Sequence, residues 1–296
     1  MAAPISDPDQ TFDRLRPRLQ AIAYRMLGAV AEAEDVVQDA WLRWHGTDRA
    51  TIDNAEAWLV SVTTRLAIDH LRAAKLQREH YAGIWLPEPL LADSPDSPEA
   101  IHERADDVSV AFLFLLERLT PEARAAFLLR EVFDADYAQV AEVVGKSEAA
   151  CRQLVSRAKT QLRGEQPRQP VGKDVHLSLV RRLAQALEQG TFDAIRSVLA
   201  DEATLIGDGG GKVSSFPKPL VGGGRIAQVY FAAARRGQAV HAQIVLLNGQ
   251  WSLLRFIDGK LESAQTFETD GERIVSIHAQ RNPDKLQRIL AAISRP

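Results

Sequence analysis

The residues at 208 to 212, Asp-Gly-Gly-Gly-Lys, are the first place in this sequence where chemistry can be expected. Glycine-rich loops that end in lysine often hold phosphate groups, because backbone N–H groups and an ammonium group surround the anion. A phosphate-binding P-loop needs the pattern GxxxxGK[ST] between a strand and a helix. Here Val213 follows Lys212, and the segment FPKP at 216–219 prevents a helix from starting. The pattern therefore argues against nucleotide hydrolysis.

Three side chains nearer the C-terminus could act as acids or bases, namely Tyr230, His241 and His278. Proton transfer by such groups is normally supported by a second titratable group, such as a paired carboxylate or a third triad member. The sequence shows no such pairing around them. Each is more simply a half-buried residue whose polar tip finds a partner, so we predict no catalytic residue.

The composition is that of an ordinary globular protein, with 296 residues, 46% hydrophobic residues and a net charge of -3. Because the chain is slightly acidic, any nucleic-acid binding must come from local basic patches. A single cysteine excludes an internal disulfide framework and a multi-cysteine metal site. No stretch offers the roughly 20 apolar residues that a membrane span needs. We therefore expect a cytoplasmic protein without membrane association.

Segments with helical spacing alternate with breaks rich in proline. Apolar residues recur three and four positions apart from about residue 12 to 81, around a polar loop at 46–54, and again from about 99 to 162. Four prolines between residues 87 and 98, and the sequence GEQPRQPVG at 164–172, interrupt this pattern. The breaks predict three domains, at 1–82, 106–165 and 173–296, joined by linkers at 83–105 and 166–172.

The last domain has a different pattern. Two helices, at about 174–189 and 192–199, precede a strand at 203–207 and a helix at 225–235. Four β-like runs follow, separated by NGQ, DGK and TDGE, which are the Asn-Gly and Asp-Gly signals of tight hairpins. Helices followed by an antiparallel meander predict an α+β domain with helices on one face of a curved sheet.

Residues 137–163 have the pattern of a helix-turn-helix, with Gly145 in the turn and Ser147 as the N-cap of the longer helix. We expect Ala150, Leu154, Ala158 and Leu162 to form its buried stripe. From residue 146 to 163 there are five basic residues against one acidic residue, which favours DNA binding over a merely solvated helical hairpin. The candidate DNA contacts are Ser147, Arg152, Gln153, Ser156, Arg157 and Lys159.

Two N-terminal helices carry opposite charges. The segment AEDVVQDAWLRW at 33–44 places an acidic and amide stripe opposite Val37, Trp41 and Trp44. In the next helix, at 57–78, four basic residues outnumber Asp69. An acidic helix followed by a basic helix suggests two partners of opposite charge, although a solvated surface would also explain the acidic stripe.

At these two helices and the helix-turn-helix the chain strongly resembles a bacterial extracytoplasmic-function sigma factor. The resemblance covers roughly residues 10–163. It implies that AEDVVQDAWLRW binds the RNA polymerase core through Glu34, Asp35, Gln38 and Asp39. It also implies that the next helix opens the minus-ten element, with Arg72, Lys75 and Arg78 on phosphates, and that the helix-turn-helix reads the minus-thirty-five element. Many members have Asn where this chain has Arg65, so no base-reading role is transferred to Arg65.

The linker and the last domain resemble one branch of that family, which carries a SnoaL-like domain after region 4. WLPEP at 85–89, DGGGK at 208–212 and NPDKL at 282–286 are similar to the signature blocks of that branch. The resemblance implies an α+β SnoaL-like (nuclear-transport-factor-like) cone domain, and we read the three blocks as regulatory contacts between domains. The candidate contact residues are Trp85, Leu86, Pro87, Asp208, Gly209, Gly210, Gly211, Lys212, Asn282, Pro283, Asp284 and Lys285.

The resulting hypothesis is a multidomain protein: two all-α sigma domains, regions 2 and 4, precede the α+β domain, which modulates promoter-specific transcription in cis. It performs no bond chemistry and needs no cofactor or metal; its partners are the RNA polymerase core, promoter DNA and, in the last domain, a possible unknown small ligand. One alternative is a catalytically active cyclase or isomerase fused to the DNA-binding part. Another is a helix-turn-helix repressor with a ligand domain, which leaves the helix at 33–44 without a purpose.

Overall fold

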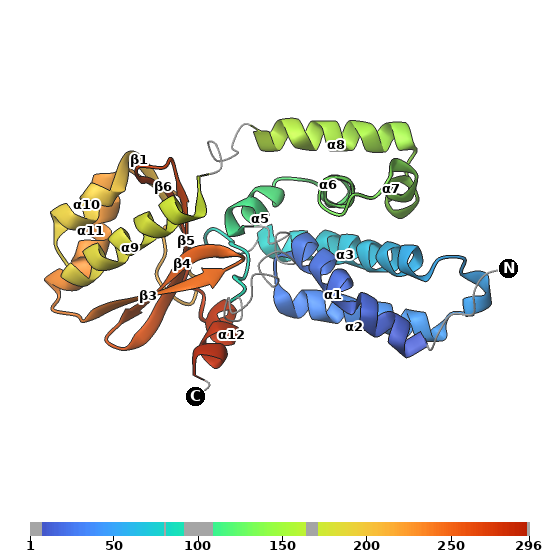
Figure 1. Ribbon diagram of the computed structural model, residues 1–296, viewed down its shortest axis with the longest axis horizontal. Coiled ribbons are helices and arrows are strands. Elements are labelled where there is room, and N and C mark those ends of the chain that lie inside the picture. Colours follow the sequence, from blue (N-terminus) through green and yellow to red (C-terminus); the bar gives the residue numbers. More distant parts are fainter. Residues whose placement is uncertain (1–7, 80, 92–108, 164–170, 295–296) are drawn as a thin grey trace. The chain divides into compact units, whose positions relative to one another are not determined.

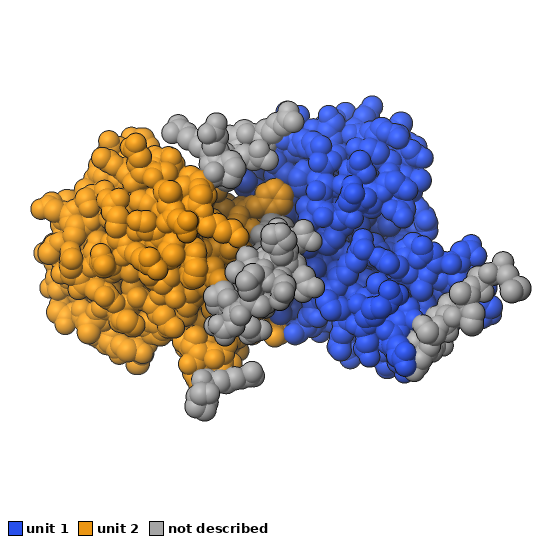
Figure 2. All heavy atoms as spheres, in the orientation of Figure 1, with its two compact units in different colours: residues 1–79, 115–165 blue, residues 80–114, 166–296 orange. Residues whose placement is uncertain are grey.

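The computed structural model describes residues 8–79, 81–91, 109–163 and 171–294 (Figure 1). The chain divides into two compact units (Figure 2). Unit 1 consists of residues 1–79 and 115–165, and unit 2 consists of residues 80–114 and 166–296. The division does not follow the order of the chain. The beginning of the linker after the N-terminal helices belongs with the C-terminal part of the molecule.

The first part of unit 1 is a bundle of α1 (Pro8–Leu27), α2 (Val30–Gly46) and α3 (Ala55–Glu79), with a short 3-10 turn at Arg49–Thr51. Its core is built from large apolar side chains with no solvent contact, including Leu19, Met26, Trp44 and Leu59. Trp41 was expected to share a face with Trp44, but it is 39% exposed and its ring lies 4.2 Å from that of His45. Three positions along a helix turn a side chain by about 300°, which leaves it about 60° from its starting direction, so Trp41 lies at the edge of the face that Trp44 places in the core.

The second part contains α5 (Val110–Leu116), α6 (Pro121–Glu131), α7 (Tyr137–Val144) and α8 (Glu148–Arg163). Thr120 caps α6, which begins with Pro121, as its sequence predicts. Asp136 and Gln139 form a reciprocal capping box at the start of α7. Gly145 ends α7 in the left-handed conformation, with φ of 69°. The predicted helix-turn-helix at 137–163 is therefore present as α7, a tight turn and α8.

The expected buried stripe of α8 was wrong by one position at its start. The buried residues are Cys151, Val155, Ala158 and Leu162, whereas Ala150 and Leu154 are only partly buried. A strict spacing of four residues drifts by about 40° per step around a helix, because a turn contains 3.6 residues. Steps that alternate between four and three residues keep the stripe facing the core.

The C-terminal domain in unit 2 combines four described helices with a sheet whose strands are arranged in the order β2-β1-β6-β5-β4-β3. The helices are α9 (Lys173–Gln189), α10 (Phe192–Val198), α11 (Gly223–Arg235) and α12 (Pro283–Ile293), and residues 110–114 of α5 also belong to unit 2. The strands are β1 (Leu199–Asp208), β2 (Leu220–Val221), β3 (Val240–Leu247), β4 (Gln250–Ile257), β5 (Lys260–Thr269) and β6 (Ile274–Gln280). The predicted Asn-Gly and Asp-Gly turns connect β3 to β4 and β4 to β5.

The sheet contains both parallel and antiparallel pairs, and two separate apolar clusters join it to helices. Strands β3 to β6 pair antiparallel as expected, but β1 pairs parallel with β6. One cluster joins the sheet to α9, α10 and α11. A second cluster joins Leu247, Leu254 and Ala264 to Leu286 and Ile289 of α12, with Leu91 packed against it. The sequence predicted the first set of helices, whereas α12 was not predicted.

His278 of β6 is a buried, neutral imidazole. It is 4% exposed, its ring lies 5.8 Å from that of Phe114, and its Nδ1 atom has no hydrogen-bond partner among the described residues. Because burial disfavours the charged form, the pKa of His278 falls from 6.5 to about 4. The folded protein therefore binds this proton less readily than the unfolded chain.

This difference predicts a stability that falls as the pH drops from about 6.5 towards about 4, because in that window the unfolded state binds the additional proton. The slope contributed by one such group is at most about 1.4 kcal/mol per pH unit. Urea unfolding at several pH values should therefore show a shallower acid dependence for His278→Gln than for the wild type. His241→Gln, an exposed histidine, is the control. Identical acid dependence of the wild type and His278→Gln would contradict this account.

Candidate functional site

The carboxylate of Asp208 is the centre of the most highly connected polar site in unit 2. Asp208 ends β1 and has an exposed fraction of 0%. Its Oδ1 accepts hydrogen bonds from the Tyr81 hydroxyl at 2.6 Å and from the Gly210 N–H at 2.9 Å. Its Oδ2 accepts from the Leu86 N–H at 2.9 Å and from Lys285 Nζ at 2.7 Å. We call Tyr81, Leu86, Asp208 and Lys285 the Asp208 cluster.

Lys285 supplies the charge that makes this burial possible. Its side chain is 12% exposed, and its ammonium also donates to the Leu86 carbonyl at 2.6 Å. The ammonium lies 4.2 Å from the centre of the Trp85 ring and 5.2 Å from that of Tyr81. Burial and the neighbouring Asp208 carboxylate raise the pKa of Tyr81, so its hydroxyl stays a hydrogen-bond donor. A buried ion pair needs this kind of complete hydrogen bonding, because unpaired charges are costly in a protein interior.

Two amide side chains complete the site. Asn282 caps α12 by accepting from the Asp284 N–H at 3.1 Å, and it donates to the Tyr81 hydroxyl at 3.0 Å. Gln280, the last residue of β6, donates to the Leu86 carbonyl at 3.2 Å. Gln280 was missed by the sequence analysis. The available signal was its position at the end of a predicted strand, directly before the NPDKL block.

The glycines of DGGGK allow close approach. A Cβ atom at Gly210 would lie 2.3 Å from the Asn282 amide, and one at Gly211 would lie 2.9 Å from the Ala82 side chain. Both glycines also have positive φ, 61° and 71°, which side chains with a Cβ disfavour. The loop is therefore a tight turn that lets the start of the linker and the start of α12 meet. Lys212, at its end, pairs with Asp284 at 2.5 Å on the surface.

The structure thus brings the three sequence blocks together. Residues 81–91, which we call the linker segment, run along the C-terminal domain, and Leu91 forms a bridge with Leu247 of β3. Leu86 and Pro87 are buried and Trp85 is partly buried. The remaining predicted contact residues of the blocks, Gly209 and Pro283, lie in the turn after β1 and at the first position of α12.

The helix-turn-helix presents its predicted contact residues on the surface of unit 1. Ser147 accepts a hydrogen bond from the Ala150 N–H at 3.3 Å and acts as the expected N-cap. Arg152 pairs with Glu148 at 3.0 Å, and Lys159 pairs with Glu131 at 2.6 Å. The exposed polar residues between them are Gln153, Ser156 and Arg157. A phosphate bound by Arg152 or Lys159 would have to replace the carboxylate that pairs with that residue.

The acidic stripe of α2 is fully accessible within unit 1. All four predicted residues, Glu34, Asp35, Gln38 and Asp39, are exposed. Leu42, on the same helix, is 54% exposed, so the surface combines carboxylates with apolar area. Such a mixed surface is typical of protein–protein contacts, whose centre is apolar and whose rim is charged.

The basic residues of α3 are partly occupied by other side chains. Arg72 donates to Glu122 of α6 at 2.6 Å and to Asp69 at 3.1 Å, and these carboxylates raise its pKa. The side chains of Lys75 and Arg78 lie outside the described residues. Arg72 is therefore the predicted phosphate contact in α3 whose position can be described, and it is already paired.

Arg65 was given no role by the sequence analysis, yet it forms a specific contact. Its Nη2 donates to the Glu142 carbonyl at 2.6 Å and its Nε to the Val143 carbonyl at 3.3 Å. Both carbonyls belong to the last turn of α7. Backbone acceptors carry no sequence signal, so this contact could not be predicted.

The three residues considered as acids or bases make separate contacts. Tyr230 donates to Gln265 at 2.9 Å, and burial raises its pKa. His241 pairs on the surface with Glu188 at 2.9 Å. In the part of the chain that the structure describes, no three His, Cys, Asp or Glu side chains could together hold a metal ion. Likewise, none of the described helices is long and apolar enough to cross a membrane.

Comparison with known proteins shows similarity along most of the chain. Residues 11–77 match Sigma-70 region 2, and residues 109–162 match Sigma-70, region 4. The chain is 39% identical over 245 residues to the ECF RNA polymerase sigma factor SigJ of Mycobacterium tuberculosis, covering 81% of this chain and 78% of that protein. It is 29% identical over 289 residues to the probable ECF RNA polymerase sigma factor SigI of the same organism, covering 94% of each.

The same relationship appears in three dimensions. The crystal structure of the extracytoplasmic function sigma factor SigJ of Mycobacterium tuberculosis matches with a TM-score of 0.73 and 34% sequence identity. The match covers 94% of this chain and 98% of that chain. The likeness therefore includes the C-terminal α+β domain as well as the helical part.

We predict that Asp208→Asn destabilises unit 2 strongly, because it leaves the Lys285 ammonium buried without its counter-charge. Breaking one partner of a buried pair typically costs about 3–5 kcal/mol. Asp284→Asn is the matched control: it makes the same change in the exposed pair with Lys212 and should cost less than about 1 kcal/mol. Urea unfolding measures both. Equal losses for the two variants would show that Asp208 is not the structural centre of the site.

Proposed function

We propose, because this chain belongs to the family of extracytoplasmic-function (ECF) RNA polymerase sigma factors, that its C-terminal SnoaL-like domain regulates promoter-specific transcription initiation in cis through the Asp208 cluster. Members of this family direct the RNA polymerase core to promoter DNA. The observation that carries the proposal is the fully buried Asp208 carboxylate, which binds the Leu86 N–H of the linker segment.

The position of this contact explains how a C-terminal domain can act on promoter recognition. The chain between regions 2 and 4 comprises residues 78–108, and the linker segment is its residues 81–91. A free extended chain spans at most roughly 3.3–3.6 Å per residue, so holding eleven residues fixes the path of up to roughly 35–40 Å of the chain between the two regions. Regions 2 and 4 must separate to reach the minus-ten and minus-thirty-five elements. Binding of the linker segment therefore biases the arrangement of the two regions.

The proposal gives each segment of the chain a role. Residues 1–82 act as region 2 and residues 106–165 as region 4, with the linkers at 83–105 and 166–172 and the regulatory domain at 173–296. Transcription of DNA places the protein in the cytoplasm. The C-terminal domain performs no bond chemistry in this proposal. The buried, neutral His278 and the hydrogen-bonded Tyr230 support that role, since neither has a carboxylate partner in the hydrogen bonds described.

The test of the regulatory role is run-off transcription with the polymerase core. We compare the full chain, Asp208→Asn, and a chain that ends at Gly172. Coupling between sites is typically worth about 1–3 kcal/mol, so we expect Asp208→Asn to change transcript yield by roughly 5- to 150-fold, in the same direction as the truncation. Asp284→Asn should resemble the wild type. A large effect of the truncation without any effect of Asp208→Asn would exclude the Asp208 cluster as the point of control.

Binding to the polymerase core is assigned to the acidic stripe of α2. Reversal of two charges, Asp35→Lys with Asp39→Lys, should weaken core binding by about tenfold or more, because a complementary basic surface would then be repelled. Asp13→Lys, an exposed carboxylate on α1, is the control for net charge. Fluorescence anisotropy with labelled protein measures the affinity. Unchanged binding by the folded double variant would remove this assignment.

Reading of the minus-thirty-five element is assigned to Arg152, Gln153 and Arg157, with Lys159 on a phosphate. Arg152→Ala should cost about 1–3 kcal/mol on the preferred element and relax base preference. Lys159→Ala should weaken all sequences alike and lower the slope of log affinity against log salt by about one. Anisotropy titrations on matched and altered elements at several salt concentrations separate base reading from phosphate binding. If Arg152→Ala and Lys159→Ala lowered the affinity equally for all DNA sequences, the roles would be assigned wrongly.

A further inference from the structure

One side of α3 carries two arginines that both reach residues of region 4. Arg65, Asp69 and Arg72 are spaced by four and three positions, so they lie on one face of the helix. Arg65 donates to backbone carbonyls of α7, and Arg72 donates to the Glu122 carboxylate of α6. These contacts lie within unit 1. The face of α3 that carries Arg72, a predicted phosphate contact, is therefore in contact with region 4, although the Arg72 side chain stays 56% exposed.

Of the two contacts, that of Arg65 is more closely tied to the backbone of region 4, because its acceptors are carbonyl groups of α7. The last carbonyls of a helix have no partner within the helix and carry its negative dipole end, so a guanidinium group is well suited to bind them. The two acceptors, the Glu142 and Val143 carbonyls, lie directly before the left-handed Gly145 that ends α7.

A third arginine joins the two regions in the same way. Arg124 of α6 is buried, and its Nη1 donates to the Met26 carbonyl near the end of α1 at 2.6 Å. Its Nε donates to the Leu116 carbonyl of region 4 at 3.0 Å. The polar contacts described between regions 2 and 4 are thus arginine side chains on backbone carbonyls or on an acidic side chain.

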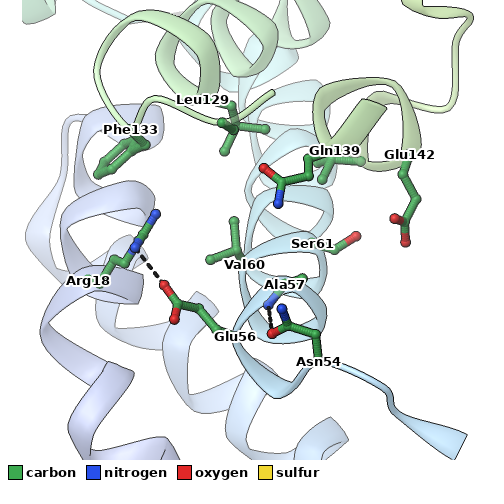
Figure 3. A pocket seen from close by; sticks show the side chains of 12 residues that line it. Arg18, Asn54, Glu56, Ala57, Val60, Ser61, Leu129, Phe133, Gln139 and Glu142 are labelled. Atoms are coloured by element: carbon green, nitrogen blue, oxygen red, sulfur yellow. Dashed lines mark hydrogen bonds and ion pairs between the residues drawn. The ribbon is translucent and has the colours of Figure 1, made fainter. Parts of the chain in front are cut away.

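The interface is incompletely filled on the N-terminal side of Arg65. A pocket of about 110 Å³ lies between α3 and the α6–α7 side of region 4 (Figure 3). Val60 and Ser61 line it from α3, and Leu129 and Gln139 line it from region 4. The Ser61 hydroxyl is buried, and among the described residues it has no hydrogen-bond partner. Side chains therefore leave room at this part of the interface, where a densely packed core would be filled.

We propose that the promoter-facing side of α3 is also a docking surface for region 4 of the same chain. Arg65 positions the end of α7, and Arg72 exchanges Glu122 for a DNA phosphate when the regions separate. The inference rests on the proposed function, because that function assigns Arg72 to DNA. The inference adds region 4 of the same chain as a competitor of DNA for this surface. Region 4 and the minus-ten strand then exclude each other on α3.

Electron spin resonance distance measurements on the full chain test the docking. Spin labels are placed at Asp13→Cys on α1 and Ala149→Cys on α8, two exposed positions, while the native Cys151 is fully buried. We expect one narrow distance distribution for the otherwise wild-type chain. Glu122→Arg should broaden it and shift it to longer distances, because Arg72 then faces a like charge. The double change Arg72→Glu with Glu122→Arg should restore the narrow distribution. A Glu122→Arg distribution identical to the wild type would overturn the docking.

Binding of single-stranded DNA tests the competition. The probe is the minus-ten strand of a promoter on which the wild-type chain initiates run-off transcription. Glu122→Gln should raise the affinity by about 3- to 10-fold, because Arg72 is released for a phosphate. The restored pair, Arg72→Glu with Glu122→Arg, should bind more weakly than the wild type although it docks. Glu131→Gln, which changes the pair with Lys159 of α8, is the matched control and should leave this affinity unchanged. No gain for Glu122→Gln would overturn the competition.

These results are independent of the C-terminal domain. If Glu122→Gln shows no gain while Asp208→Asn still changes transcription, the docking surface is rejected and the proposed regulation stands. If Glu122→Gln binds more tightly while neither Asp208→Asn nor the truncation changes transcription, the docking surface stands and the regulatory role of the C-terminal domain is rejected.

Discussion

A carboxylate with no solvent contact, that of Asp208, is the interaction on which unit 2 depends. Its charge is tolerated because Lys285 supplies the opposite charge and because the Tyr81 hydroxyl and the Leu86 N–H fill its remaining acceptor positions. Two of these partners belong to the linker and one to the last helix. The carboxylate therefore needs two distant parts of the chain at once, and removing either leaves a buried charge unsatisfied.

This requirement connects sequence blocks that have no other reason to occur together. The WLPEP block supplies the backbone donor, the NPDKL block supplies the lysine, and the DGGGK block supplies the carboxylate together with glycines that remove the Cβ atoms from the approach. Unit 1 follows a different design. Arg65 and Arg72, both exposed, join its two regions through contacts that are exchanged more readily than a buried ion pair, whereas Arg124 is buried and also pairs with Glu117.

Much of this organisation could be predicted from the sequence, and each wrong or missing prediction has a physical reason. Apolar spacing located the helices, Asn-Gly and Asp-Gly marked the hairpins, and the three blocks were expected to meet. The parallel pairing of β1 with β6 joins segments about 70 residues apart, which no local pattern reveals. Arg65 donates to backbone carbonyls, and Gln280 donates to the Leu86 carbonyl, and every residue possesses such an acceptor. The stripe of α8 was wrong because a fixed four-residue spacing drifts around a 3.6-residue turn, so Cys151 and Val155 replaced Ala150 and Leu154.

The most direct test of the central claim, that the Asp208 carboxylate holds the linker segment on the C-terminal domain, is hydrogen–deuterium exchange of the full chain. The Leu86 amide is buried and bonded to Asp208, so peptides covering residues 81–87 should exchange slowly in the wild type. In Asp208→Asn they should exchange at nearly the rate of an unstructured chain, while the peptides of β4 and β5 keep their protection. Equal protection of residues 81–87 in the two proteins, with the sheet intact in both, would contradict the account.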